Sequence, residues 1–159
     1  PSATLGTIAG VGNTLMAATS GPAADLVIGH NLVTLKQDFQ RQMDGRVIWG
    51  PVAAGDQGVV LTDDQVLQGL ASDGKPTFSV SVPRGLPVGE PIMHEGKMIL
   101  VSDSGWIVVI DSATGEQVGL TEIGQPFSAT PMILKDQLLV PGAEGVVYIV
   151  SIPTEVPGQ

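Results

Sequence analysis

Short apolar runs separated by polar, glycine-containing turns recur along this chain every 40 residues. Each copy begins with a proline and continues as an apolar pair, a polar turn, an apolar run, a second polar turn and another apolar run. The prolines are Pro51, Pro91 and Pro131, and the segment 11–16 continues the pattern 40 residues before Pro51 without a proline. Apolar, β-branched runs of this length between turns predict strands and not helices.

The third copy shows the pattern most clearly. Its predicted strands, of which the last is polar and alternating, are residues 92–93, 98–101, 106–110 and 116–123. The run 106–110 is continuously apolar, as expected for a strand covered on both faces. In the fourth copy the equivalent run is 146–150, and the chain then reaches Pro153, Pro157 and Gly158 where an outer strand would follow.

The first copy matches the pattern least closely. Its inner strands are predicted at 15–18 and 26–28, and its outer strand at 32–35. The polar stretch 36–43 that follows is predicted as either a short helix or an extension of the sheet edge. In the second copy the third and outer strands are predicted at residues 66–70 and 77–82.

Together these patterns predict an all-β fold of four-stranded antiparallel meanders in a single repeat domain, residues 1–159. The repeats are predicted at residues 8–47, 48–87, 88–127 and 128–152, the last without its outer strand. Stacking of neighbouring sheets at about 10 Å would cover their apolar faces, and radial stacking is typical of a β-propeller or part of one. The predicted core contains Met93, Ile99, Val101, Ile107, Val109, Ile133, Leu139, Val147 and Ile149.

Composition narrows the choice of partners. The 21 Gly and 12 Pro suit many strands joined by tight turns, and the net charge of −9 argues against general affinity for nucleic acid or anionic lipid. Cysteine is absent, which excludes disulfides, thiolate zinc sites and cysteine nucleophiles. No apolar stretch is long enough to span a membrane. Because the chain begins at Pro1, we interpret it as an excised or processed form.

Residues 109–116 read Val-Ile-Asp-Ser-Ala-Thr-Gly-Glu. This segment resembles the pyrroloquinoline-quinone-type (quinoprotein-like) propeller repeat, whose blades carry an Ala/Val-x-Asp-x-x-Thr-Gly stretch followed by a tryptophan. In such a turn the Asp and Thr side chains hydrogen-bond to backbone and the glycine adopts a left-handed conformation. The tryptophan position falls near Gly119, which is not aromatic, and the second copy keeps only Asp73-Gly74.

The resemblance implies a propeller of about seven or eight blades in an extracytoplasmic, periplasmic or secreted, bacterial protein. Some members of the family are quinone-dependent dehydrogenases with adjacent cysteines, a stacking tryptophan and acidic calcium ligands, and many members are non-catalytic. This chain has no cysteine, and neither Trp49 nor Trp106 matches the stacking position. We therefore predict no catalytic, cofactor-binding or metal-binding residues and no cofactor.

Single residues give no stronger indication of chemistry. His30 and His94 lie in or near predicted turns and form no His-x-x-x-His pair. Trp106 and Tyr148 are predicted to pack in the core or between blades. The chain lacks a Gly-x-Ser-x-Gly elbow, and the glycine-rich segment 6–12 lacks the Lys-Ser/Thr of a phosphate loop. Acidic residues assigned to turns, without the spacing of a calcium loop, are Asp63, Asp64, Asp103, Asp111 and Glu116.

The stretch 37–42, with Lys36, Arg41 and Arg46, is polar, leans basic and departs from the repeat. It is predicted either to bind a partner or to form a solvated strand or short helix.

The favoured hypothesis is a non-catalytic β-propeller module that binds a protein or a small ligand through its loops. The alternative is a fragment of a quinone-dependent dehydrogenase-like enzyme whose active site lies in missing blades. Four copies either close a ring alone or form half of a ring of about eight blades. Because the last copy lacks an outer strand, we expect a homo-oligomer that completes a larger propeller, or a shortened chain.

Overall fold

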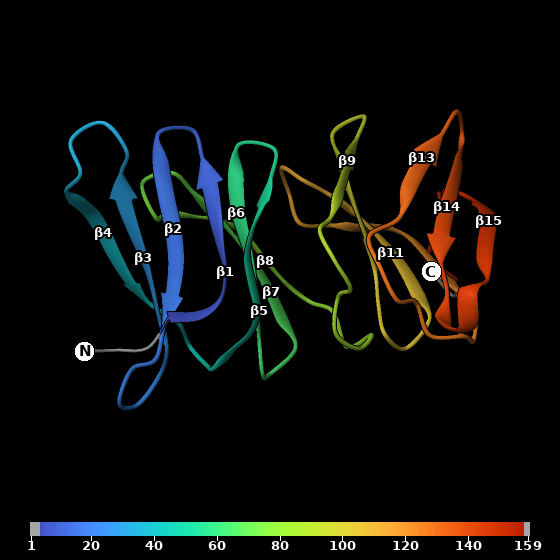
Figure 1. Ribbon diagram of the computed structural model, residues 1–159, viewed down its shortest axis with the longest axis horizontal. Coiled ribbons are helices and arrows are strands. Elements are labelled where there is room, and N and C mark those ends of the chain that lie inside the picture. The colour runs from blue at the N-terminus through green and yellow to red at the C-terminus, as the bar shows by residue number, and fades with distance from the viewer. Residues whose placement is uncertain (1–3, 158–159) are drawn as a thin grey trace. The chain divides into compact units, whose positions relative to one another are not determined.

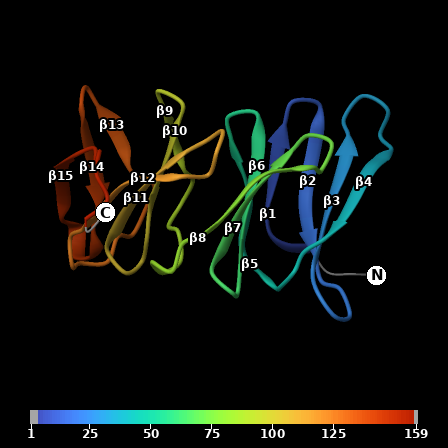
Figure 2. The same cartoon turned by 180° about the vertical axis from the view of Figure 1, so that it is seen from behind.

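Antiparallel strands make up nearly all the regular structure of the computed structural model, which describes residues 4–157 (Figures 1 and 2). They form four sheets, and in each sheet the strands pair in the order in which they follow one another along the chain. The predicted all-β meanders are therefore confirmed. Gly158, which was named with Pro153 and Pro157 after the last predicted strand, lies outside the described residues.

The strand bounds follow the repeat. Sheet 1 contains β1 (Thr4–Val11), β2 (Thr14–Thr19), β3 (Leu26–Asn31) and β4 (Gln37–Gln42). Sheet 2 contains β5 (Val47–Ala54), β6 (Gln57–Thr62), β7 (Val66–Ala71) and β8 (Pro76–Ser81). Sheet 3 contains β9 (Ile92–His94), β10 (Lys97–Val101), β11 (Trp106–Asp111) and β12 (Gln117–Glu122). Sheet 4 contains β13 (Met132–Leu134), β14 (Gln137–Pro141), the 3-10 turn η1 (Ala143–Gly145) and β15 (Val147–Ser151).

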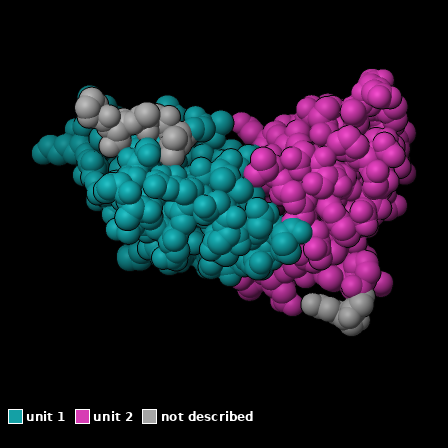
Figure 3. Space-filling model, turned by 90° about the horizontal axis from the view of Figure 1, so that it is seen from below, with its two compact units in different colours: residues 1–83 teal, residues 84–159 magenta. Residues whose placement is uncertain are grey.

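The chain folds into two compact units, which are coloured separately in Figure 3. Unit 1 ends at Pro83 and unit 2 begins at Arg84. Sheets 1 and 2 belong to unit 1, and sheets 3 and 4 belong to unit 2. Each unit thus contains two neighbouring repeats. Within the described residues sheet 4 has three strands.

The outer strand of sheet 1 is β4, and the prediction of an outer strand at 32–35 is wrong. The Asn31 side-chain oxygen accepts hydrogen bonds from the N–H groups of Val33 (2.9 Å) and Thr34 (3.0 Å). The Asn31 N–H donates to the Lys36 carbonyl (2.9 Å) and closes the turn. These bonds make 32–35 a turn in spite of its apolar side chains, and the polar stretch after it is a strand and not a helix.

Sheets 1 and 2 pack face to face in unit 1. Their shared core consists of the buried residues Ala9, Val11, Met16, Val27, Met43, Val60 and Leu70. Phe39 on β4 packs against this core, opposite Gly29 on β3. A Cβ atom at position 29 would lie 2.1 Å from the Phe39 ring, so glycine is required beside the aromatic side chain. Complete burial of each large aliphatic side chain contributes about 1.5–3 kcal/mol.

A buried aspartate joins the loop after β2 to the start of β5. The Asp25 side chain is 3% exposed and accepts hydrogen bonds from Arg46 Nη1 (2.8 Å) and from the Val47 N–H (2.9 Å). Arg46 Nη1 also donates to the Gly21 carbonyl (2.9 Å). Burial raises the pKa of the Asp25 carboxyl, but the hydrogen bonds from Arg46 and Val47 outweigh it and hold that pKa below 3.8. The ionised carboxylate therefore stabilises the connection between sheets 1 and 2.

Sheets 3 and 4 pack face to face in unit 2. Their core consists of the buried residues Ile99, Val101, Ile107, Val109, Phe127, Leu138 and Val140. Four of the predicted core residues are thereby confirmed, namely Ile99, Val101, Ile107 and Val109. The prediction is wrong for Met93, Val147 and Ile149, which are exposed, and Ile133 and Leu139 are only partly buried. In β15 the residues that face the core are Tyr148 and Val150, because Val147 and Ile149 lie on the opposite face.

The segment that follows β15 runs along β12 of sheet 3 and does not extend sheet 4. The Leu120 N–H donates a hydrogen bond to the Glu155 carbonyl (3.0 Å), and Pro153 is buried. A Cβ atom at Gly119 would lie 2.2 Å from the Pro153 carbonyl oxygen. The tryptophan position of the repeat motif falls near Gly119, where backbone of the C-terminal segment packs against β12.

Asp25→Asn is expected to lower the free energy of unfolding at pH 7 by about 1–3 kcal/mol, because hydrogen bonds to a buried charged group are lost. Folding lowers the pKa of Asp25, so its contribution is fully present above the unfolded-state value of 3.8 and is lost as the pH falls through the folded-state value. The difference in the free energy of unfolding between the unsubstituted chain and Asp25→Asn should therefore be smaller at about pH 2 than at pH 7. Urea denaturation at the two pH values measures it.

The matched control is Asp44→Asn, which removes an exposed carboxylate two residues before Arg46. It should change the stability by no more than about 0.5 kcal/mol. A difference between the unsubstituted chain and Asp25→Asn that stays constant on acidification would contradict an ionised, hydrogen-bonded Asp25.

Gly119→Ala is expected to release the C-terminal segment from β12, because the new methyl group meets the Pro153 carbonyl oxygen. The Leu120 amide should then exchange its hydrogen at least about tenfold faster, as measured by NMR hydrogen exchange. Gly10→Ala is the control, because a Cβ atom at position 10 meets no atom within 4 Å. Unchanged protection of the Leu120 amide in Gly119→Ala would show that the segment does not depend on this contact.

Candidate functional site

Aspartates at equivalent loop positions bind the connections that enter sheets 2 and 3. Asp63 Oδ1 accepts a hydrogen bond from the Arg46 N–H (2.9 Å), and Asp103 Oδ1 accepts one from the Leu86 N–H (3.0 Å). Asp64 accepts a hydrogen bond from the Thr62 hydroxyl (2.5 Å). These carboxylates lie in loops, as predicted, and stabilise them.

Asp111 forms the turn that the repeat motif predicts. Its Oδ1 atom accepts hydrogen bonds from the N–H groups of Ala113 (3.0 Å) and Thr114 (2.9 Å) and from the Thr114 hydroxyl (3.1 Å). The bonds from Thr114 hold the pKa of the Asp111 carboxyl below its usual value. Glu116 follows this turn and donates its N–H to the Thr114 hydroxyl oxygen (3.2 Å).

Sheet 1 contains a second copy of this turn that the motif alone does not identify. Asn31 and Thr34 lie 80 residues before Asp111 and Thr114, and Asn31 binds the turn backbone as Asp111 does. The copy is hidden because asparagine replaces the aspartate and Leu35, with φ of 57°, replaces the glycine. The 80-residue spacing is the signal that reveals it.

The aromatic residues pack against protein. Tyr148 meets Phe127 edge-to-face with ring centroids 6.0 Å apart, within the core of unit 2. The Arg84 guanidinium lies 4.7 Å from the centroid of the Trp106 ring. Trp49 is a half-buried residue of β5. Packing between sheets is therefore confirmed for Tyr148.

The two histidines lie in different units, and the basic stretch lies in unit 1. His30 lies within β3 and not in the predicted turn, whereas His94 ends β9 beside a turn as predicted. Lys36 precedes β4 and is exposed, and Arg41 lies on β4. Arg46 is held by Asp25, so its guanidinium has a structural partner.

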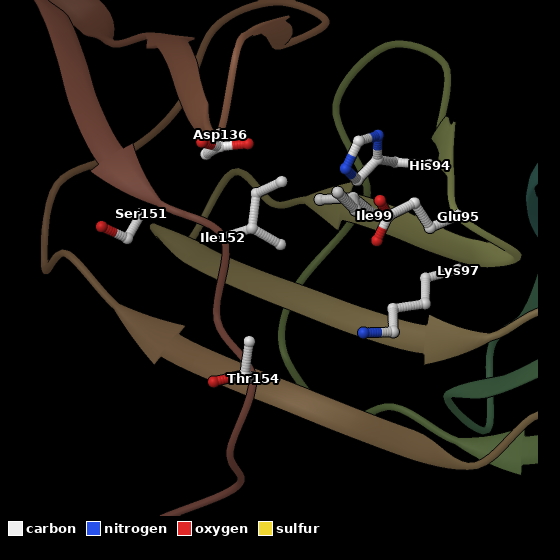
Figure 4. Close-up of a pocket in the computed structure, with 8 residues that line it drawn as sticks. All are labelled: His94, Glu95, Lys97, Ile99, Asp136, Ser151, Ile152 and Thr154. Atoms are coloured by element: carbon white, nitrogen blue, oxygen red, sulfur yellow. The ribbon is translucent and has the colours of Figure 1, made fainter.

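A cavity of about 350 Å³ lies in unit 2, between the β9–β10 hairpin, the β13–β14 hairpin and the segment that leaves β15 (Figure 4). Its polar lining includes His94, Glu95, Lys97 and Asp136. Its apolar lining is Ile99 and Ile152. In Figure 4 the carboxylate of Glu95 and the ammonium group of Lys97 point toward the space between the two hairpins. The cavity lies at the lower end of the size range of ligand pockets.

The charges of the cavity suit a small polar ligand or a peptide. Lys97 can pair with a carboxylate, and Glu95 and Asp136 can each accept hydrogen bonds from an amine. The two isoleucines provide apolar contact beneath them. Among residues 4–157, no three or more His, Asp or Glu side chains group in a way that could hold a metal ion.

Two hairpins around the cavity keep charged residues in a conformation that favours glycine. The first residue of the β5–β6 hairpin turn is Gly55, with φ of 67°. The equivalent residues of the next two repeats are Glu95 (φ 48°) and Lys135 (φ 57°). A non-glycine residue in the left-handed region costs about 1–2 kcal/mol. The same conformation occurs away from the cavity at Leu35, Gln65 and Glu144.

The sequence matches no protein-family model, and a comparison with curated proteins finds no significant match. Solved structures resemble the fold. BamB from Moraxella catarrhalis superposes with a TM-score of 0.73 at 15% identity, over 94% of this chain and 47% of that one. The computationally designed Ika4 protein superposes with a TM-score of 0.72 at 13% identity, over 95% of this chain and 92% of that one.

The four sheets are β-propeller blades. The chain spans about half the length of BamB, and 50% of BBS1N, a structure solved in complex with ARL6DN, which it matches at 14% identity with a TM-score of 0.64. At these identities the likeness shows the fold alone. The fold class predicted from the 40-residue period is thereby confirmed. No family model matches the chain, and the resemblance to BamB is one of fold.

Glu95→Gly is expected to raise the free energy of unfolding by about 0.5–1 kcal/mol, because glycine adopts the left-handed conformation without strain. Urea denaturation at neutral pH measures the change. Glu144→Gly is a matched substitution, since Glu144 has φ of 62° in η1 and does not line the cavity. A loss of stability in Glu95→Gly would show that the Glu95 side chain stabilises the hairpin and that the strain argument fails.

Proposed function

We propose that the chain is a non-catalytic propeller module that binds a protein or a small ligand through the hairpin end of blades 3 and 4. The cavity carries this proposal. It places one lysine, two carboxylates and one histidine above two isoleucines. Such a mixture of charge and apolar surface recognises a peptide, or a ligand with both an amine and a carboxylate.

The use of polar side chains elsewhere in the fold supports binding over catalysis. The predicted turn carboxylates Asp63, Asp103 and Asp111 accept hydrogen bonds from backbone N–H groups and stabilise loops. Rigid blades then hold the hairpins of the cavity in fixed positions, which lowers the entropic cost of binding. Among the similar propellers, BBS1N was solved in complex with another protein, ARL6DN.

We also propose an extracytoplasmic location, supported by the resemblance of residues 109–116 to the pyrroloquinoline-quinone-type repeat. Among the described residues, no helix has the length and apolar character needed to cross a membrane.

Selection of a random-peptide phage library on the immobilised chain tests the proposed binding. Selected peptides should bind the unsubstituted chain and lose about tenfold or more in affinity for Lys97→Ala and Asp136→Ala, because each substitution removes a charge-assisted hydrogen bond. Isothermal titration calorimetry measures the affinities. Both substituted residues line the cavity.

Lys36→Ala is the matched control, because Lys36 is exposed and lies in unit 1. It removes the same charge as Lys97→Ala and should leave the affinity unchanged. Selected peptides that bind all three variants as well as the unsubstituted chain would overturn the assignment of binding to this cavity.

A further inference from the structure

Blade 4 presents an uncovered apolar face. Its members are Met132, Leu134, Leu139, Val147 and Ile149, which we call the blade 4 outer face. Cross-strand pairing aligns Met132 with Leu139 and Leu139 with Ile149, so these side chains point to the same side of the sheet. Met132 is 64% exposed and Ile149 is 63% exposed. None of the five carries a charge, in a chain whose net charge is −9.

The equivalent residues of blade 3 show what such a face contacts elsewhere in this fold. Forty residues before Met132, Leu139, Val147 and Ile149 lie Ile92, Ile99, Ile107 and Val109. Those four residues of blade 3 belong to the core that blade 3 forms with blade 4. The blade 4 outer face therefore repeats, position for position, a face that packs on the next blade.

Blade 1 presents the complementary face. Ile8, Leu15, Ala17 and Ile28, which we call the blade 1 outer face, lie on the side of sheet 1 opposite the unit 1 core. Ile8 is 56% exposed, and the other three are partly exposed.

In blades 2 and 4, the residues equivalent to the blade 1 outer face pack on the preceding blade. By position in the second strand of each sheet, which begins at Thr14 in β2 and at Gln57 in β6, Leu15 and Ala17 are equivalent to Gly58 and Val60 of blade 2. A Cβ atom at Gly58 would lie 2.6 Å from Met16 Sδ of blade 1. In blade 4 the equivalent residues are Leu138 and Val140, which pack on blade 3. The chain thus carries both halves of an interface that it forms once within each unit.

We propose that the blade 4 outer face of one copy packs on the blade 1 outer face of a second copy, and that two copies complete a larger propeller. The presence of both complementary faces on one chain supports a second copy as the occupant. Two copies have about the length of BamB and the designed Ika8 protein, of which the chain covers 47% and 46%, whereas one copy covers 92% of the designed Ika4 protein. The mass in solution therefore distinguishes the two arrangements, and neither face opposes like charges to the other. This assembly does not depend on ligand binding at the cavity.

Light scattering on a sizing column measures the assembly directly. The chain of 16.4 kDa should elute with the mass of two copies. Ile149→Lys and Ile8→Lys should each weaken dimerisation by about tenfold or more, because a buried, unpaired charge is introduced into the contact. Both side chains are exposed in the single copy, so each variant should remain folded by circular dichroism. Val33→Lys, at an exposed turn position outside both faces, should dimerise as the unsubstituted chain does.

Mixing the two variants separates this contact from other modes of pairing. An equimolar mixture of Ile149→Lys and Ile8→Lys retains one unaltered contact, between blade 4 of the second variant and blade 1 of the first. The mixture should therefore form more dimer than either variant alone. A monomeric unsubstituted chain would overturn the proposal, and so would open-ended assemblies. Dimerisation that Ile8→Lys leaves unchanged would overturn the choice of blade 1 as the contact.

Discussion

Face-to-face packing of sheets is the constraint on which the rest of this structure depends. Each blade has apolar side chains on both faces, and a single sheet of three or four short strands cannot cover either of them. Within unit 1 the covered faces belong to blades 1 and 2, and within unit 2 to blades 3 and 4. The outer faces of blades 1 and 4 also carry apolar side chains, among them Ile8 and Ile149, and these are exposed.

Turn chemistry accounts for most of the conspicuous polar residues. Asn31 and Asp111 bind the backbone of equivalent turns, and Asp63 and Asp103 bind the connections into their blades. A side chain committed in this way to its own backbone is a poor candidate for chemistry. The residues that we propose for recognition lie at the hairpins around the cavity, where the repeat has Glu95 and Lys135 in place of Gly55.

Prediction from sequence succeeded where local and tertiary preferences agree. The strands of the third copy were predicted to within two residues at each end, because continuous β-branched runs between turns have no competing local structure. It failed at 32–35, where Asn31 closes a turn over apolar residues, and at Val147 and Ile149, which were assigned to the core. Alternation shows which residues share a face of a strand, but only a neighbouring sheet decides which face is buried. The cavity likewise depends on how two hairpins and the C-terminal segment meet in space, and this meeting is not encoded locally.

The sequence by itself determined the all-β class, the 40-residue repeat, the meander order and the turn role of Asp111, because each depends on interactions between residues close along the chain. Only the tertiary structure decided that the segment after β15 runs along β12, that its backbone packs against Gly119, and that His94, Lys97 and Asp136 line one cavity. These features arise where segments distant in sequence meet, and the free energy of such contacts depends on the packing of whole sheets.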